Sequence, residues 1–265
     1  MEVKVITQDQ HFGKVNGIHV DDMYSPYKRK EQLKYMKEKK VDYVYSQDYD
    51  ISYLIEVPSV KYLILNEDIE NIDTIYLLPN LEGLLINSKY LKDIDLKKLP
   101  KLNKIVIWHS NKEIINVGNN VKEITIIGYD FSDLTKIMDN PLLEKLYISY
   151  GQKLQSLEGV EKFKNLKEIT IDGCFRLHKI SDLSNCKKLI KLNIYDCNKI
   201  EDLFVSISKL NNIEEINLFN LETNVINTMK DLSFLEGLNK LKFLKTDYKI
   251  LNKNSMYINK VIEIK

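Results

Sequence analysis

Cysteine is scarce in this sequence, with only three in 265 residues. An odd and sparse count argues against a disulfide framework and predicts reduced thiols, so we expect a cytoplasmic protein. The three are Cys174, Cys186 and Cys197, and no Cys-x-x-Cys pair is present to indicate a zinc or redox site. Because a free cysteine most often behaves as a small buried hydrophobe, we expect structural roles for them.

Long apolar runs are missing as well. No stretch of about 18 apolar residues occurs, so the sequence predicts no membrane span. The start, MEVKVITQDQHFGK, lacks a basic stretch followed by an apolar core, and we expect no secretory signal. The apolar fraction of 44% is ample for a continuous core, so we expect one elongated, soluble domain.

Arginine is nearly absent, since only Arg29 and Arg176 occur beside many lysines. Together with abundant Ile and Asn, this composition is typical of an AT-rich genome, and we expect a bacterial source. The net charge is +1. The chain therefore lacks the global basic excess that drives nucleic-acid binding.

Catalytic and metal-binding motifs are also missing. The sequence contains no G-x-S-x-G, H-E-x-x-H, G-x-x-x-x-G-K-[ST] or G-x-G-x-x-G. His11, His19 and His109 are far from any partner at ligand spacing, and His178 follows Cys174 by four residues, which alone is a poor zinc signal. We therefore expect a protein that is not an enzyme and that uses no cofactor and no metal.

A repeated phrase is what the sequence does contain. Pro58, Pro79 and Pro100 stand 21 residues apart, Pro141 follows later, and each precedes by two residues the pattern apolar-x-x-apolar-x-apolar. Internal repeats with a period near 21–24 residues are typical of solenoids. The phrases are Val60-Leu63-Leu65, Leu81-Leu84-Ile86, Leu102-Ile105-Ile107, Val121-Ile124-Ile126, Leu143-Leu146-Ile148, Leu166-Ile169-Ile171, Leu189-Leu192-Ile194 and Ile213-Ile216-Leu218, with a degenerate first copy at Val41-Val44-Ser46 and a weak last copy at Leu241-Leu244-Thr246.

This pattern resembles the leucine-rich repeat, L-x-x-L-x-L, and the resemblance covers about residues 41–248. The alternation within each phrase puts its fourth and sixth positions on one face of a short strand. One unit cannot bury that face, but stacked neighbours can. About a dozen residues separate consecutive strands, too few for long helices. We therefore predict an α/β leucine-rich repeat solenoid, with a curved parallel sheet on the concave side and short helical turns or loops on the convex side.

Two units resemble the cysteine-containing subtype of these repeats. Leu166–Cys174 and Leu189–Cys197 both follow L-x-x-[LI]-x-I-x-x-C, and Cys186 stands three residues before Leu189. The resemblance implies that the ninth residue, Asn or Cys, ties neighbouring turns together by hydrogen bonds. Because other residues occupy that position elsewhere, we expect an uneven stack, tighter in its first half and wider in its second. Those residues are Asp68, Lys89, Ser110, Tyr129, Gly151 and Leu221.

The two ends of the chain predict caps over the open ends of the solenoid. Asn16-Gly17, within Val15–Ile18, has the signal of a tight hairpin turn between short strands. Ser25-Pro26 predicts the start of a helix to about Lys39, with Leu33 and Met36 facing inward. The alternation in Met256–Lys265 predicts a closing strand. The predicted organisation is an N-terminal cap over 1–40, repeats over 41–248 with an insertion around 222–231, and a C-terminal capping strand over 249–265.

The predicted N-terminal helix is rich in positive charge. Its basic residues could dock an acidic partner or a phosphate backbone, or they could form a solvated face that keeps the cap soluble. Stacking aromatics are not interleaved with them, which disfavours nucleic acid. Nucleic-acid or acidic-partner binding is therefore the alternative function. The basic residues are Lys28, Arg29, Lys30, Lys34, Lys37, Lys39 and Lys40.

The fifth, seventh and eighth positions of each phrase are expected to point onto the concave sheet, where stacking aligns them into columns. These columns contain large aromatics, the side chains of which interface hot spots are made, and acids that could steer a basic partner. The alternative is that strand aromatics only pack against cross-strand neighbours. The candidate partner-binding residues are Trp108, His109, Tyr147, Tyr150, Asp172, Tyr195, Asp196 and Phe219.

The sequence thus predicts a non-enzymatic module that binds a partner protein on its concave face. By resemblance, short bacterial chains of this irregular type look like immunity proteins that neutralise a toxin, or like regulatory adaptors. We expect a monomer in isolation, with no membrane partner.

Overall fold

The structure of the chain, a computed structural model, describes residues 4–20, 26–65, 68–109, 114–221, 228–229, 233–247, 249–250 and 262–264. The chain forms two compact units. Unit 1 comprises Met1–Ser110 with Asn116–Val121, and unit 2 comprises Asn111–Ile115 with Lys122–Lys265. The boundaries at residues 40 and 248 stay predictions.

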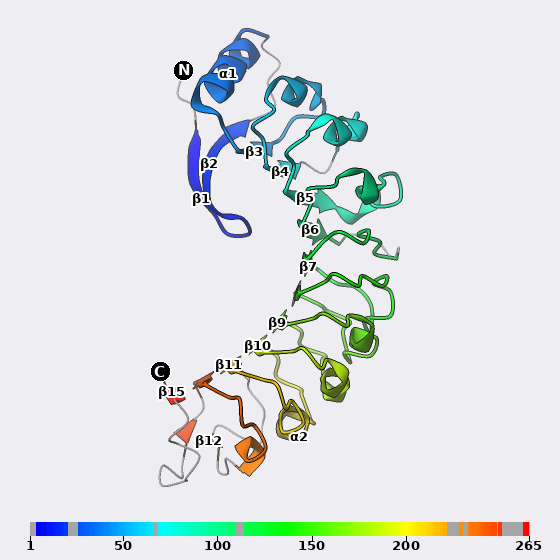
Figure 1. Cartoon of the computed structure of the whole chain (residues 1–265), viewed down its shortest axis with the longest axis vertical. Coiled ribbons are helices and arrows are strands. Elements are labelled where there is room, and N and C mark those ends of the chain that lie inside the picture. The colour runs from blue at the N-terminus through cyan, green and yellow to red at the C-terminus, as the bar shows by residue number, and fades with distance from the viewer. Residues whose placement is uncertain are drawn as a thin grey trace. The chain divides into compact units, whose positions relative to one another are not determined.

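Unit 1 pairs its strands in chain order from β1 to β6. β1 and β2 are antiparallel, and each later pair in the unit is parallel. The strands lie along one side of the unit and the 3-10 helices along the other (Figure 1). The elements are β1 (Val5–Asp9), β2 (Gly13–Val20), α1 (Pro26–Lys39), β3 (Tyr43–Ser46), η1 (Ser52–Glu56), β4 (Tyr62–Leu65), η2 (Ile72–Leu77), β5 (Gly83–Asn87), η3 (Ser88–Tyr90), η4 (Leu96–Lys98) and β6 (Lys104–Trp108).

Unit 2 continues the same plan with a sheet in the order β7-β8-β9-β10-β11-β13-β15, all parallel. β12 and β14 form a separate parallel pair. The elements are β7 (Glu123–Ile127), β8 (Lys145–Ser149), η5 (Val160–Lys162), β9 (Glu168–Asp172), η6 (Ser181–Asn185), β10 (Lys191–Tyr195), α2 (Leu203–Ile207), β11 (Glu215–Phe219), β12 (Thr228–Met229), η7 (Ser233–Leu235), β13 (Phe243–Thr246), β14 (Lys249–Ile250) and β15 (Ile262–Ile264).

The strands and the core confirm the repeat phrase. Each predicted phrase begins two residues before a strand, and the apolar residues at its fourth and sixth positions are buried. In β8, for example, Leu146 and Ile148 are buried and lie opposite Ile169 and Ile171 of β9. Neighbouring phrases thus share one apolar core in each unit, as short strands that cannot fold alone require.

The prolines stand in the turns that lead into the strands, as their spacing predicts. Asparagines in the turns before the strands supply ties between neighbouring turns, which the sequence reasoning missed. Asn80 Nδ2 donates to the Pro58 carbonyl at 2.8 Å, and Asn212 Nδ2 donates to the Lys187 carbonyl at 2.8 Å. Asn165 makes the same contact with the Pro141 carbonyl. These asparagine amides tie neighbouring turns together just before the strands, which is the role that the resemblance implies for the ninth residue.

The predicted turn at Asn16-Gly17 is wrong. The hairpin turns between Asp9 and Gly13, whereas Asn16 and Gly17 lie inside β2. Gly17 is required there for space, because a Cβ would lie 2.5 Å from Cδ1 of Tyr43.

β2 is instead one more copy of the repeat phrase. Val15, Ile18 and Val20 have the apolar-x-x-apolar-x-apolar spacing and are buried. β2 pairs with β3 in parallel, with Ile18 opposite Val44. The phrase therefore starts earlier in the chain than residue 41, and its spacing in the sequence could have shown this.

The structure describes parts of the predicted N-terminal helix, the predicted insertion and the predicted closing strand. The helix predicted to end near Lys39 is α1, in which Met36 is buried and Leu33 is half-buried. Ser25 and most of the insertion around 222–231 lie outside the described residues. Within the predicted closing strand, the described part is β15, which pairs with β13. In the described ranges, no helix has the length and apolar character needed to span a bilayer.

Candidate functional site

The sheet face that bears the fifth- and seventh-position side chains is called the open face, and in unit 2 it brings several predicted contact residues together. Asp172, Tyr195 and Phe219 are direct neighbours across β9, β10 and β11. The rings of Tyr195 and Phe219 stack with centroids 6.0 Å apart. Tyr147 Oη donates to Asp172 Oδ2 at 2.8 Å. All four side chains are half-buried, so they form a continuous aromatic row with a carboxylate inside it.

A buried polar ladder lies beside this row. Asn217 Nδ2 donates to Asn193 Oδ1 at 2.7 Å, and Asn193 Nδ2 donates to Thr170 Oγ1 at 2.8 Å. Both amides are buried and hydrogen-bonded, so the ladder fixes the spacing of β9, β10 and β11. The sequence contains Asn193 and Asn217 in one column, but nothing in a single sequence marks them as a ladder.

The row combines tyrosine hydroxyls with carboxylates. Burial raises the pKa of Tyr147, and the hydrogen bond to the Asp172 carboxylate raises it further. Tyr147 therefore stays protonated at neutral pH, and its hydroxyl donates to the Asp172 carboxylate. Asp196 and Asp247 follow the strand ends next to it, and Asp247 Oδ2 accepts from the Asn220 amide at 2.8 Å. Asp196 and Asp247 thus add two carboxylates beside the row, which already contains Asp172.

The eighth position has a backbone role that the sequence did not predict. Five residues that directly follow a strand adopt positive φ: Gly128, Tyr150, Gly173, Asp196 and Asn220, at 77°, 53°, 62°, 51° and 54°. Their N–H groups point towards the neighbouring strand. For example, the Tyr150 amide donates to the carbonyl of Asp172, the last residue of β9, at 2.9 Å. Tyr150 remains a candidate contact because 57% of its surface is exposed, but its position is set by this left-handed turn.

Replacing Gly173 by alanine is expected to cost about 1–2 kcal/mol, because the left-handed conformation places Cβ against the following carbonyl. The φ of Gly173 is 62°, and a Cβ would also lie 3.2 Å from Cδ1 of Tyr150. The matched control is Gly237→Ala, where φ is not positive and the nearest atom would be 3.8 Å away. Urea denaturation followed by circular dichroism compares the two. Equal stability of both variants would contradict the turn assignment.

In unit 2 the ninth position is buried. Cys174 and Cys197 are buried, as expected of structural cysteines. Gly151 leaves room for the first of them, since a Cβ there would lie 2.9 Å from Cys174 Sγ. The hydrogen bond between the two thiols lowers the pKa of Cys174 and raises that of Cys197. In the described part of the chain, no group of three or more His, Cys, Asp or Glu side chains could hold a metal ion.

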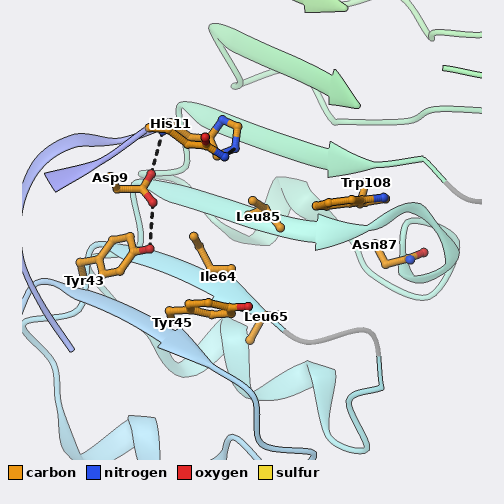
Figure 2. A pocket seen from close by; sticks show the side chains of 10 residues that line it. Asp9, His11, Tyr43, Tyr45, Ile64, Leu65, Leu85, Asn87 and Trp108 are labelled. Atoms are coloured by element: carbon orange, nitrogen blue, oxygen red, sulfur yellow. Dashed lines mark hydrogen bonds between the residues drawn. The ribbon is translucent and has the colours of Figure 1, made fainter. Parts of the chain in front are cut away.

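Unit 1 contains a pocket of about 420 Å³ on its open face. Its floor is the apolar fifth-position column, represented by Tyr45, Ile64 and Leu85 (Figure 2). Trp108, of which 53% is exposed, lines the pocket from β6. The remaining lining residues are Asp9, Gln10, His11, Tyr43, Leu65 and Asn87.

The tip of the β1–β2 hairpin is fixed beside this floor. Asp9 Oδ1 accepts from the His11 amide at 2.8 Å, and Asp9 Oδ2 accepts from Tyr43 Oη at 2.9 Å (Figure 2). Asp9 Oδ1 also accepts from the Phe12 amide at 2.9 Å. The Phe12 ring stacks on Tyr62 with centroids 5.2 Å apart. Gly83 permits this contact, because a Cβ there would lie 2.5 Å from the Phe12 ring.

Asp9 is the one formal charge among the residues that line the pocket. Burial lowers the pKa of His11, so this imidazole is neutral at neutral pH. Burial, followed by the nearby Asp9 carboxylate, raises the pKa of Tyr43, which keeps its phenol protonated. The pocket therefore combines aromatic and aliphatic walls with a single negative group.

Trp108 and His109 lie in different environments. Trp108 is exposed at the pocket, as predicted for a contact residue, whereas His109 is only 5% exposed. The prediction that His109 lies beside Trp108 on the contact surface is therefore wrong, because the chain turns it inward after β6. The sequence reasoning also missed Asp9, because it placed the hairpin turn at Asn16-Gly17 instead of at the pocket. It missed Tyr43 and Tyr45, which lie in the degenerate first phrase.

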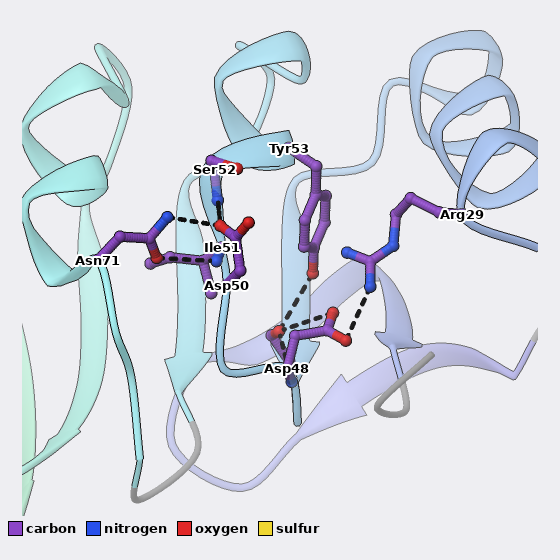
Figure 3. Close-up of polar contacts among 8 residues, drawn as sticks. Arg29, Asp48, Asp50, Ile51, Ser52, Tyr53 and Asn71 are labelled. Carbon is purple, nitrogen blue, oxygen red and sulfur yellow. Dashed lines mark hydrogen bonds and ion pairs between the residues drawn. The ribbon is translucent and has the colours of Figure 1, made fainter. Parts of the chain in front are cut away.

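The basic helix α1 is engaged in part with the rest of unit 1. Arg29 Nη2 donates to Asp48 Oδ1 at 2.7 Å, and its guanidinium lies 3.9 Å from the centroid of the Tyr53 ring (Figure 3). Lys37 Nζ donates to Glu56 Oε2 at 2.6 Å. Arg29 therefore holds the helix against the first turns rather than extending a surface patch.

Comparison with known sequences places these features in a class. Residues 141–241 match the family described as the endo-beta-N-acetylglucosaminidase EndoS LRR domain. A segment of 110 residues is 26% identical to the disease resistance protein RPS4B of Arabidopsis thaliana and covers 38% of this chain and 9% of that protein. The chain thus spans less than a tenth of the length of that relative.

Solved structures extend the likeness over most of the chain. A chain of the TLR13–ssRNA13 complex has a TM-score of 0.58 at 17% identity, covering 84% of this chain and 34% of that one. A leucine-rich repeat protein of Leptospira interrogans has a TM-score of 0.53 at 13% identity, covering 82% and 57%. Stacked parallel strands with short 3-10 turns define a solenoid, and these matches identify its repeats. The chain is a leucine-rich repeat protein.

Proposed function

We propose that this chain is a non-enzymatic module that binds a partner protein on the open face of its repeats. The observation that supports this most directly is the row of Tyr147, Asp172, Tyr195 and Phe219 in unit 2. Partly exposed aromatics with few rotatable bonds lose little entropy on binding, so they contribute most of their burial to affinity. The hydrogen-bonded ladder beside them keeps the surface preformed.

The partner that this surface suits is a basic protein, and an immunity role against a basic toxin in the cytoplasm is the specific form of the proposal. Asp172 within the row and Asp196 and Asp247 beside it would speed and orient encounter with positive charge. The Toll–Spatzle complex, a chain of which has a TM-score of 0.51 at 12% identity, supports the general idea that this fold serves in protein complexes.

Binding of nucleic acid or of an acidic partner through α1 has less support. The TLR13 relative is in complex with single-stranded RNA, but this chain has a net charge of only +1 and directs Arg29 inward. Retention on heparin that falls steeply with salt would favour this alternative, because phosphate binding releases counterions.

Tyr195→Ala is expected to weaken binding of a toxin encoded beside this chain by about 30-fold or more, since hot-spot truncations cost about 2 kcal/mol or more. Trp108→Ala is expected to weaken it in the same direction. Isothermal titration calorimetry on the purified pair measures the change and its one-to-one stoichiometry. The matched control is Val205→Ala, an exposed apolar residue on α2 away from the open face. Unchanged affinity in both aromatic variants would refute open-face binding.

A further inference from the structure

The open faces of the two units differ in chemistry. In unit 1 the fifth-position column holds Tyr45, Ile64 and Leu85, whereas in unit 2 it includes Thr170, Asn193 and Asn217. Only the apolar column has the hairpin tip with Asp9 beside it. The open face of each unit therefore suits different partner side chains.

The pocket of unit 1 has the size and walls for one long side chain. Its volume of about 420 Å³ lies at the low end of the roughly 300–1,000 Å³ of small-ligand sites. Ile64 and Leu85 offer an aliphatic floor, while Tyr45 and Trp108 offer ring surfaces. An occupant that fits must have an apolar stem.

The negative charge of Asp9 favours a cationic group at the end of that stem. Asp9 is the single formal charge in the lining, and Oδ2 has one acceptor site occupied by Tyr43 Oη. A carboxylate oxygen can accept more than one hydrogen bond, so Asp9 can receive a further donor. Aromatic rings attract cations through their faces, which adds to the attraction of the carboxylate.

We propose that this pocket receives an arginine side chain that the partner protein presents, with its stem on Ile64 and Leu85 and its guanidinium between Asp9 and the ring of Trp108. The inference rests on the proposed function, because it assigns the partner's anchor. Arginine fits better than lysine, since the planar guanidinium stacks on aromatic rings and is less strongly hydrated than an ammonium group.

Trp108 is the only tryptophan in the chain and provides the reporter. Titration of the full chain with N-acetyl-arginine amide is expected to change tryptophan fluorescence in a saturable way. N-acetyl-citrulline amide, the uncharged isostere, and N-acetyl-lysine amide are expected to bind at least about tenfold more weakly, a ratio that corresponds to about 1.4 kcal/mol. Citrulline or lysine derivatives that bind as tightly as arginine, or no saturable change with arginine, would overturn the proposal.

Asp9→Asn tests the assigned contact. Asparagine keeps an oxygen that can accept from the His11 and Phe12 amides, so the hairpin tip can persist while the charge is lost. The variant is expected to lose the preference for arginine over citrulline. Asp130→Asn, a surface carboxylate paired with Lys153 in unit 2, is the matched control and should retain it. An unchanged preference in Asp9→Asn would remove Asp9 from the site. If the variant fails to fold, the comparison of the arginine, citrulline and lysine derivatives on the unaltered chain still tests the proposal.

The two proposals can fail separately. The small probes report on the unit 1 pocket alone, whereas Tyr195→Ala reports on the unit 2 row. Loss of the arginine response together with a strong Tyr195→Ala effect on the partner would overturn the pocket and leave open-face binding intact. An arginine response with no effect of either Tyr195→Ala or Trp108→Ala on partner binding would overturn the proposed function.

Discussion

Replacement of Leu146 by alanine is expected to destabilise the protein by about 2–5 kcal/mol, the range for deletion of a buried leucine side chain from a packed core. Leu146 is fully buried at the fourth position of its phrase, and β8 pairs with strands on both sides. Its cavity would open between neighbouring repeats that share one core, where a short turn has little freedom to collapse. Urea denaturation monitored by circular dichroism measures the change in the free energy of unfolding.

Glu144→Ala is the control from the same repeat. Glu144 lies on the surface just before β8, where Lys167 Nζ donates to its Oε2 at 2.7 Å. Surface ion pairs contribute little, so the expected change is within roughly half a kcal/mol. If the two variants were equally stable, the assignment of core and surface positions within the phrase would be wrong, and with it the repeat alignment.

Periodicity was sufficient to predict the fold, because the core of a solenoid repeats with the sequence. Leu84 and Leu192 occupy the fourth position of two repeats that lie more than a hundred residues apart in the sequence, and both are fully buried. The same logic predicted the parallel strands and the short helical turns. The physical reason is that each turn buries only what its neighbours supply, so local spacing specifies tertiary contacts.

The pocket could not be predicted because it depends on a hairpin outside the regular phrase. Asn16-Gly17 carries the strongest local signal for a tight turn, yet Gly17 is there to admit the Tyr43 ring. Tertiary packing of one aromatic side chain overrode the local preference. The phrase Val15-Ile18-Val20 could have placed Asn16-Gly17 inside a strand, but it does not show that the hairpin turns at Asp9–Gly13 and brings Asp9 to Tyr43.

The left-handed residues show a second limit of sequence reasoning. Gly128 and Gly173 reveal their backbone requirement by being glycine, but Tyr150 and Asp196 occupy the same conformation with side chains that conceal it. Alignment of the columns correctly grouped these positions. The alignment could not distinguish residues whose side chains are available for contacts from residues that serve the left-handed turn. Residues of both kinds are polar or aromatic, and both follow a strand.

Asp48→Asn is expected to cost about 3–5 kcal/mol, because loss of one partner from a buried ion pair leaves the other charge uncompensated. The Asp48 side chain is 4% exposed and that of Arg29 is 18% exposed. Besides accepting from Arg29, Asp48 receives a hydrogen bond from Ser46 Oγ, which in turn contacts Tyr53 Oη at 3.1 Å (Figure 3). The substitution therefore disturbs the packing of α1 against the first repeats, and thermal and urea denaturation should both register it.

An exposed pair between the same helix and η1 supplies the matched control. Lys37 and Glu56 approach to 2.6 Å but are 47% and 51% exposed, so Glu56→Gln is expected to cost at most about 1 kcal/mol. A double-mutant cycle with Arg29→Gln separates the pair from its surroundings: the double variant should be less destabilised than the sum of the single variants, since no lone charge remains. Additive losses would mean that Arg29 and Asp48 act independently. The N-terminal helix would then be attached by Met36 and its apolar contacts, and Arg29 would be available to a partner after all.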